Sequence, residues 1–207
     1  MTETIDWNEY QAATRKTAIY PGARTIDGLL YVACGLNGEA GEIAEHGKKL
    51  LRDDGGTLTP ERITKLRKEL GDVCWYCAGL GFEAGFKLAG CIVKPVDVPE
   101  DGNYPGKGTN RGFLYLALRL NEQAAKVGFY ANTVVGYTVP QGKSWLEVGQ
   151  GVRVAGNISR GVAFVLWYVQ ELAVLCGTDL DAVMAGNLEN LAGRQTRGTL
   201  HGDGSSR

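Results

Sequence analysis

The chain has 207 residues, of which 44% are hydrophobic and 22% charged, and its formal net charge at pH 7 is −1. This size suits one good core or two small ones, and the near-zero charge argues against nucleic-acid binding driven by bulk positive charge. No run of 18 apolar residues occurs and the start lacks signal-peptide features, so we expect a cytoplasmic protein that does not enter a membrane.

Apolar residues recur with helical spacing in six segments, whereas weak strand signals are confined to short stretches at 91–96 and 133–139. The helical segments are 7–18, 27–53, 60–88, 111–132, 155–176 and 179–194. Thr59-Pro60-Glu61 predicts a helix start, because a hydroxyl N-cap, a proline at the first helical position and an acid in the first turn all favour initiation. The expected fold class is all-α.

The cysteines are odd in number and lie in apolar segments, which predicts buried free thiols in a reducing compartment. They are Cys34, Cys74, Cys77, Cys91 and Cys176. Cys74 and Cys77 form a Cys-x-x-Cys pair, but the pair lies inside a helical stretch, which does not suit a thioredoxin-like motif. A zinc site would need two more ligands, and only Cys91 and His46 are near in sequence. We therefore interpret the pair as core residues.

Two acidic pairs stand on neighbouring predicted helices: Glu39 with Glu42, and Glu69 with Asp72. A spacing of three residues puts both acids of a pair on one helix face, which they share with apolar residues. Carboxylates that converge in an interior repel one another, and a bound hard cation, Mg²⁺ first, is the usual remedy. The alternative is solvated surface acids. Gly41 and Gly71 favour the interior site, because glycine weakens a helix unless close packing requires it.

An internal repeat divides the chain. Residues 28–40 overlay 112–124 at an offset of 84, and residues 72–80 overlay 164–172 at an offset of 92. The apolar frame repeats but the four acids do not, since their places are taken by Gln123, Lys126, Gly161 and Phe164. We interpret the first copy as catalytic and the second as its structural partner. Chance alignment of two Leu/Ala-rich helices is the alternative.

These motifs resemble the MazG-like all-α nucleoside triphosphate pyrophosphohydrolases, a group that includes dimeric dUTPases. The resemblance rests on the two acidic pairs, on the Gly-Asp-Val-Cys-Trp-Tyr run that ends at Tyr76, and on residues 177–194, which look like the closing helix of the family. It covers residues 27–88 and 160–207. It implies a four-helix bundle that converts a nucleoside triphosphate to a monophosphate and pyrophosphate.

The resemblance also assigns roles to residues. Glu39, Glu42, Glu69 and Asp72 would be the catalytic residues and the ligands of Mg²⁺, which Mn²⁺ can replace, and one glutamate would orient or deprotonate the attacking water. Tyr76 and Asn187 would contact the substrate. The family often has Asn-x-x-Lys in the closing helix, but this chain has Asn187-Leu-Glu-Asn190, so another cation must bind phosphate. Further expected substrate-binding residues are Lys48, Lys49, Arg194, Arg197 and Arg207, with Trp7, Tyr10 and Gln11 near the base.

The expected organisation is a catalytic repeat at 1–90, a linker at 91–110, a degenerate repeat with its closing helix at 111–194, and a Gly-rich tail at 195–207. Residues 105–109 faintly resemble a phosphate loop but lack its spacing, so we assign them to the linker. The fused copies would make a pseudo-dimer, and we expect a homo-oligomer of such chains. The expected partner is a (deoxy)nucleoside triphosphate, with no nucleic acid and no membrane.

Two other functions stay open at this point. The first is a non-catalytic helical scaffold or regulator of nucleotide metabolism, which would have no need for four metal ligands. The second is a hydrolase that acts on another nucleotide diphosphate bond, which would use the same metal and the same acids. The residues do not choose the base, because base recognition depends on a few hydrogen bonds that only a folded pocket defines.

Overall fold

The computed structural model describes residues 5–91 and 103–199, and these two ranges contain helices and connecting turns without any strand. The α-helices are α1 (Trp7–Thr14), α2 (Ile26–Asp53), α3 (Pro60–Ala84), α4 (Asn110–Asn132), α5 (Gly151–Leu175) and α6 (Leu180–Thr196), with short 3₁₀ turns η1 (Arg15–Thr17), η2 (Leu88–Cys91) and η3 (Trp145–Glu147). The all-α prediction is confirmed. The strand signal at 133–139 was wrong, and residues 92–96 lie outside the described part.

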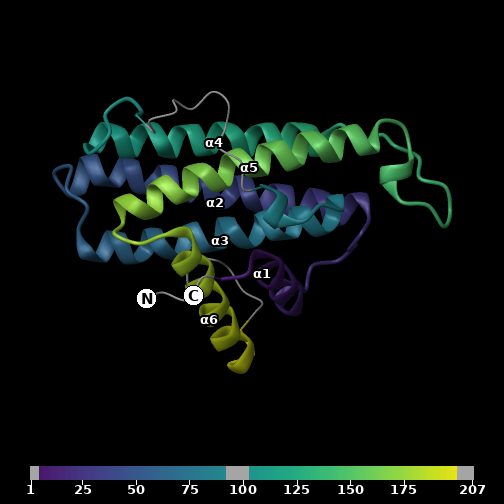
Figure 1. Cartoon of the computed structure of the whole chain (residues 1–207), viewed down its shortest axis with the longest axis horizontal. Coiled ribbons are helices and arrows are strands. Elements are labelled where there is room, and N and C mark those ends of the chain that lie inside the picture. The colour runs from purple at the N-terminus through teal and green to yellow at the C-terminus, as the bar shows by residue number, and fades with distance from the viewer. Residues whose placement is uncertain (1–4, 92–102, 200–207) are drawn as a thin grey trace.

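Helices α2 to α5 form a four-helix bundle (Figure 1). α2 and α5 each pack against both α3 and α4, so α2/α5 and α3/α4 are the diagonals. The core is the apolar stripe of each helix, which includes Leu36 and Ile43 of α2 and Leu66 and Val73 of α3. α1 and α6 lie outside the bundle against α3, and α6 points away from it. This arrangement lets three elements, α1, α3 and α6, meet beside the acidic pairs.

Local sequence explains where the helices of the first hairpin begin and end. Thr59 accepts a hydrogen bond from the backbone N–H of Arg62 at 3.2 Å, and proline follows as the first helical residue, as predicted. α3 ends four residues before the predicted position because Gly85 adopts the left-handed conformation, with φ of 76°. The segment predicted as one helix at 7–18 is α1 followed by the 3₁₀ turn η1.

The same glycine turn precedes α2 and α4. Three residues of each turn share the offset of 84: Gly22, Thr25 and Gly28 in the first, and Gly106, Thr109 and Gly112 in the second. In both turns the threonine hydroxyl donates to the first glycine carbonyl at 2.6 Å, and that glycine has positive φ. A Cβ on the last glycine would overlap that carbonyl. Residues 104–109, which we had assigned to a linker, therefore form the start of the second hairpin.

Aromatic pairs also repeat with similar geometry. Tyr20 stacks on Tyr31 with ring centroids 4.9 Å apart, and Tyr104 stacks on Tyr115 at 6.0 Å. The edge-to-face pairs correspond as well, with centroid separations of 5.0 and 4.9 Å: Trp75 with Tyr76, and Trp167 with Tyr168. Chance alignment of two apolar helices does not account for matching turns and matching ring geometry, so the structure supports the internal repeat.

Burial of the thiols follows the prediction except at one position. Cys74, Cys77, Cys91 and Cys176 are buried and free, and burial raises the pKa of each of them. Cys34 is exposed, contrary to the prediction, because it lies on the open face of α2.

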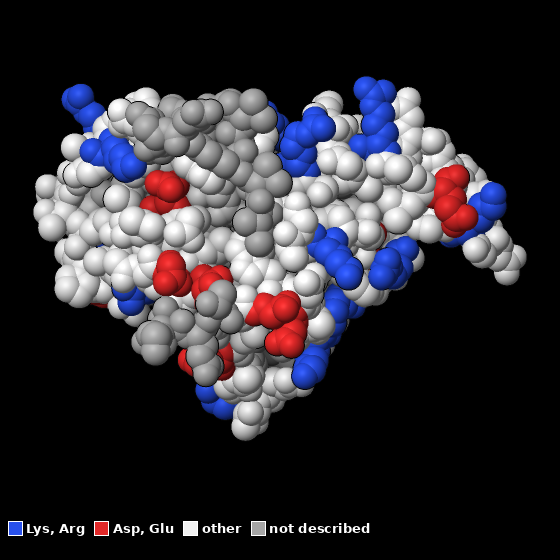
Figure 2. Space-filling model, viewed as in Figure 1, with Lys and Arg blue, Asp and Glu red and all other residues white. Residues whose placement is uncertain are grey.

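α5 has the length and composition of a membrane span, with a mean hydropathy of 1.3 over an 18-residue window. More than half of that window, 56%, is buried inside the structure, and α5 packs against α3 and α4. The core helix of a bundle has these same properties. The molecular face in Figure 2 carries both signs of charge, with acidic side chains gathered around α3 and α6. The absence of membrane and nucleic-acid partners stays a prediction.

Candidate metal centre

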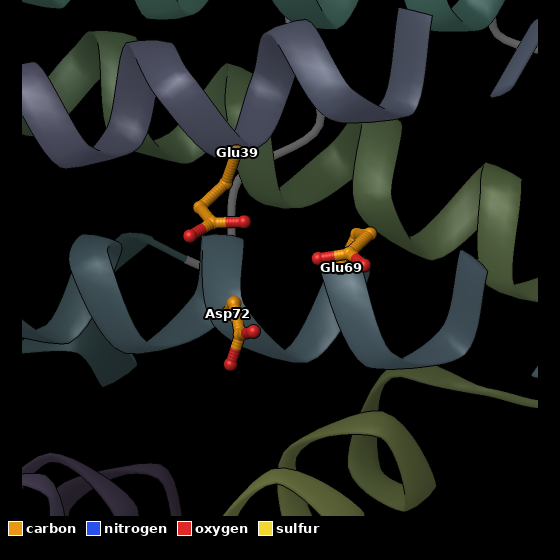
Figure 3. Close-up of side chains that lie close together, drawn as sticks. All are labelled: Glu39, Glu69 and Asp72. Atoms are coloured by element: carbon orange, nitrogen blue, oxygen red, sulfur yellow. The ribbon is translucent and has the colours of Figure 1, made fainter. Parts of the chain in front are cut away.

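Three carboxylates from two facing helices converge between α2 and α3. Glu39 extends from α2 toward α3, which carries Glu69 and Asp72 (Figure 3). One oxygen from each of the three lies within 4.8 Å of the others. Glu69 is buried, and Glu39 and Asp72 are half-buried. We call these three residues the acidic cluster. The structure thus brings together three of the four acids that the two sequence pairs predict.

Glu42 stands apart from the other three. It is exposed, and it does not belong to the group of oxygens within 4.8 Å. Its charge still acts on the cluster, since it contributes to the raised pKa values of both Glu39 and Glu69. Glu42 therefore lies at the mouth of the cluster.

The cluster is electrostatically unfavourable as it stands. Burial raises the pKa of Glu39 from 4.5 to about 8, and repulsion from Asp72, Glu42 and Glu69 adds to the effect. Burial also raises the pKa of Glu69, against the opposing attraction of Lys68. A divalent cation would reverse these shifts, because it favours the charged form of every carboxylate that binds it.

Lys68 is a member of the site that the sequence analysis missed. Its Nζ lies 3.2 Å from Glu69 Oε1 and 3.4 Å from Asp72 Oδ2. The signal was present in the sequence, since Lys68 and Asp72 are four residues apart on one helix, the spacing of a common helical ion pair. Lys68 partly neutralises the acidic cluster.

A buried chain of hydrogen bonds from α1 and α6 fixes the side chain of Asp72. Asn187 Nδ2 of α6 donates to Asp72 Oδ1 at 3.0 Å, and the Tyr10 hydroxyl of α1 donates to Asn187 Oδ1 at 3.0 Å. Both Asn187 and Tyr10 are buried. Asn187 and Tyr10, which we expected to bind substrate, therefore lie on the α6 and α1 side of Asp72, where they position its carboxylate.

Gly71 allows α6 to approach α3 at this point. A Cβ on Gly71 would lie 2.9 Å from Asn187 Cβ, whereas a Cβ on Gly41 would have no neighbour within 4 Å. We expect Gly71→Ala to destabilise the protein by about 1–3 kcal/mol, because the clash outweighs the helix propensity gained. We expect Gly41→Ala, the matched control, to stabilise it by up to about 1 kcal/mol. Urea unfolding measures both changes, and equal effects of the two variants would contradict the packing role of Gly71.

The other expected phosphate-binding cations are not brought to the acidic cluster. Lys48 and Lys49 pair with Glu45, at 2.5 and 3.5 Å, on α2 about 14 Å along the helix from Glu39. Arg194 and Arg197 lie at the far end of α6, which points away from the bundle. Arg207 lies outside the described residues.

Gln11 and Trp7, which we expected near the base of the nucleotide, instead attach α1 to its neighbours in the fold. The Gln11 amide spans the end of α3: its Nε2 donates to Phe86 O at 3.1 Å, and its Oε1 accepts from Leu88 N at 2.9 Å. Trp7 Nε1 donates to Asp181 of α6 at 3.1 Å. These contacts explain both side chains as packing residues.

An open pocket of about 510 Å³ lies one helical turn from the acidic cluster. It is lined by Asp27, Leu30, Tyr31, Cys34, Gly35 and Tyr76. Gly35 is four residues before Glu39, and Tyr76 is four residues after Asp72, so both face the same end of the site. Any Cβ on Gly35 would overlap the ring of Tyr76, so only glycine permits this ring to lie against α2. The expected contact of Tyr76 with substrate fits this pocket.

In the described part of the second half, the positions that correspond to the four acids carry no carboxylate. Gln123 is buried, Lys126 pairs with Glu122 at 2.7 Å, and Phe164 is only half-buried. In the place of Gly35 stands Arg119, whose Nε donates to the Tyr168 hydroxyl at 3.1 Å. Tyr168 corresponds to Tyr76, so an arginine contacts this tyrosine from the position where the first half has a glycine.

No protein-family model matches this chain, and no solved structure matches it. A Gene 37 protein of Mycobacterium phage L5 is 57% identical to it over 74 residues, which cover 34% of this chain and 65% of the phage protein. The match thus spans less than two thirds of the length of that relative, whose name states no activity. The site itself has to carry the functional argument.

Proposed function

We propose that this protein is a Mg²⁺-dependent hydrolase that converts a (deoxy)nucleoside triphosphate to its monophosphate and pyrophosphate. The observation that carries the proposal is the convergence of Glu39, Glu69 and Asp72 beside an aromatic-lined pocket in the same half of the bundle. In the half without the acids, Arg119 stands at the position of Gly35 and donates to the Tyr168 hydroxyl. Joint absence of the acids and of this glycine is expected if both serve one substrate.

The donor set fits Mg²⁺. This ion takes oxygen ligands at about 2.0–2.1 Å in an octahedron, so its ligand oxygens lie about 3 to 4 Å apart. Oxygens of the acidic cluster are within 4.8 Å of one another, and small side-chain rotations close the difference. Mn²⁺ has the same ligand preference. Mg²⁺ bound there would neutralise phosphate oxygens and lower the pKa of a bound water.

The protein's own residues would orient the reaction. Asn187, which accepts a hydrogen bond from Tyr10, donates to Asp72 Oδ1, and Asp72 Oδ2 lies on the side of Lys68. Glu39, which extends from α2 toward the acids of α3, would be the glutamate that orients or deprotonates the attacking water. Glu42 at the mouth would add a further oxygen ligand. Lys68, which pairs with Glu69 and Asp72, would be the cation that contacts phosphate, in place of the lysine missing after Asn187.

The architecture agrees with a MazG-like pseudo-dimer, in which the α2/α3 hairpin is catalytic and the α4/α5 hairpin is its degenerate copy. The matching turns and aromatic pairs of the two hairpins support this part of the proposal. Association of such chains into a homo-oligomer stays a prediction.

The ion pairs of Lys68 favour a second candidate, a non-catalytic scaffold in which lysine alone compensates the acids. Incubation with each deoxynucleoside triphosphate and Mg²⁺, followed by chromatography, separates the two functions. The scaffold yields no product. A hydrolase of another nucleotide diphosphate bond would leave these triphosphates intact but cleave a different nucleotide.

The products identify the bond that is cleaved. In ¹⁸O-water we expect the label in the monophosphate, because attack at the α-phosphorus leaves the water oxygen there and releases unlabelled pyrophosphate. Mass spectrometry of the separated products measures this. Label in orthophosphate, with diphosphate as the second product, would overturn the proposed cleavage site.

A further inference from the structure

The aromatic-lined pocket contains one carboxylate that has no partner among the described residues. Of the six residues that line it, Asp27 alone is charged. Asp27 is exposed, and within the described part of the chain it makes no hydrogen bond or ion pair. Arg24 and Lys143 share a neighbouring pocket with it, and neither forms an ion pair with it. Its carboxylate is available to a ligand as a hydrogen-bond acceptor.

Asp27 and the acidic cluster lie at opposite ends of one row along α2. Glu39, Gly35, Tyr31 and Asp27 follow one another at steps of four residues, so the row spans about 18 Å. If the phosphates bind at Glu39, as the proposed function requires, the sugar falls near Gly35 and Tyr76. The base then falls beside Tyr31, and its outer edge points toward Asp27.

The ring of Tyr31 is positioned so that a ligand could stack on it. One face of its ring stacks on Tyr20, whose hydroxyl donates to the buried carboxylate of Glu83 at 2.6 Å and accepts from Arg15 at 2.8 Å. Tyr31 nevertheless remains 46% exposed. A ring held on one side and open on the other is suited to stack a planar base, and stacking does not distinguish one base from another.

Discrimination between bases would come from Asp27. An ionised carboxylate only accepts hydrogen bonds. Guanine offers it two adjacent donors, N1–H and the 2-amino group. Adenine and cytosine offer one amino group beside an acceptor nitrogen, and thymine offers one N–H between two carbonyl oxygens. We propose that Asp27 makes this pocket selective for guanine nucleotides through a bidentate contact with the guanine edge.

The second half agrees with this assignment. Arg111 stands at the position that corresponds to Asp27, and Arg119 at the position of Gly35. Arginine only donates hydrogen bonds, so it cannot accept the two guanine donors. Asp27, Gly35 and the acidic cluster therefore occur together in the first half, whereas the stacked tyrosine pair occurs in both halves.

Binding of nucleoside monophosphates in Mg²⁺ tests the proposal without turnover, because they lack the bond that the proposed reaction breaks. By calorimetry we expect dGMP to bind at least about tenfold more tightly than dIMP, which lacks the 2-amino group, and than dTMP. Asp27→Asn should lower dGMP affinity about tenfold or more and change dTMP affinity less than about twofold. Glu61→Gln, which alters an exposed first-turn acid on α3, is the control and should change neither.

Equal affinity for dGMP, dIMP and dTMP would overturn the proposal, as would a guanine preference that survives Asp27→Asn in a variant with unchanged circular dichroism. Two further outcomes distinguish failure of guanine selection from failure of the proposed hydrolysis. Hydrolysis of all four triphosphates with equal kcat/KM would overturn guanine selection and leave the hydrolase intact. Asp27-dependent dGMP binding without any hydrolysis would uphold guanine selection and overturn the hydrolase.

Discussion

Glu39→Gln and Asp72→Asn are each expected to lower nucleotide hydrolysis by roughly 10²–10³-fold or more, because each removes a charged metal ligand from the acidic cluster. The fold should remain, and the metal-free variants should be as stable as the parent or more stable, since one of the mutually repelling carboxylates is gone. Steady-state kinetics with saturating Mg²⁺ and thermal unfolding without metal measure the two effects.

Glu45→Gln is the matched control. Glu45 lies on the same helix, but its carboxylate is engaged by Lys48 and Lys49 rather than by the acidic cluster. We expect its variant to keep the activity of the parent. If Glu39→Gln or Asp72→Asn retains near-parental turnover, these residues are not the metal ligands.

Glu39 is expected to lower the stability of the metal-free protein as the pH rises from about 4.5 to about 8, whereas His46, whose pKa burial lowers from 6.5 to about 4, raises the stability with pH up to about 6.5. Over this window Glu39 keeps its proton in the folded state and loses it in the unfolded state, because its pKa rises from 4.5 to about 8 on folding. The folded state then binds more protons, so the free energy of unfolding decreases with pH. The pKa of Glu69 is raised in the same direction. The loss from Glu39, measured as the difference between the parent and Glu39→Gln, should be on the order of 2–4 kcal/mol.

Mg²⁺ is expected to reverse this trend. Because the ion binds the ionised carboxylates, its affinity should increase with pH up to about 8 and its binding should release protons. Unfolding curves at pH 5 and pH 8, with and without Mg²⁺, check the first effect, and calorimetry in buffers of different ionisation enthalpy checks the second. In Glu39→Gln the pH dependence should shrink. A Glu39→Gln variant whose stability depends on pH as the parent's does would contradict the buried, protonated Glu39.

The helices and the acidic pairs are readable from the sequence because they depend on local spacing. Thr59 and Pro60 begin α3 where the capping pattern predicts, and Glu69 and Asp72 share a face because three residues nearly complete one helical turn. The repeat was also visible, since its apolar frame and glycines recur at constant offsets. Its true start at Tyr104 was missed, because a glycine turn with few apolar residues reads as a linker until its hydrogen bonds are seen.

Tertiary structure decided what these residues do. Helical periodicity assigns Glu42 to the same face as Glu39, but the position of α3 along α2 leaves Glu42 exposed outside the acidic cluster. Asn187 meets Asp72 across 115 positions of the chain, and Gly71 matters only because α6 crosses α3 at that point. The open pocket likewise depends on Gly35 facing Tyr76 from another helix. The sequence by itself determines which faces carry the acids, whereas the packing of one helix against another determines which acids meet, because that packing joins residues distant in the chain.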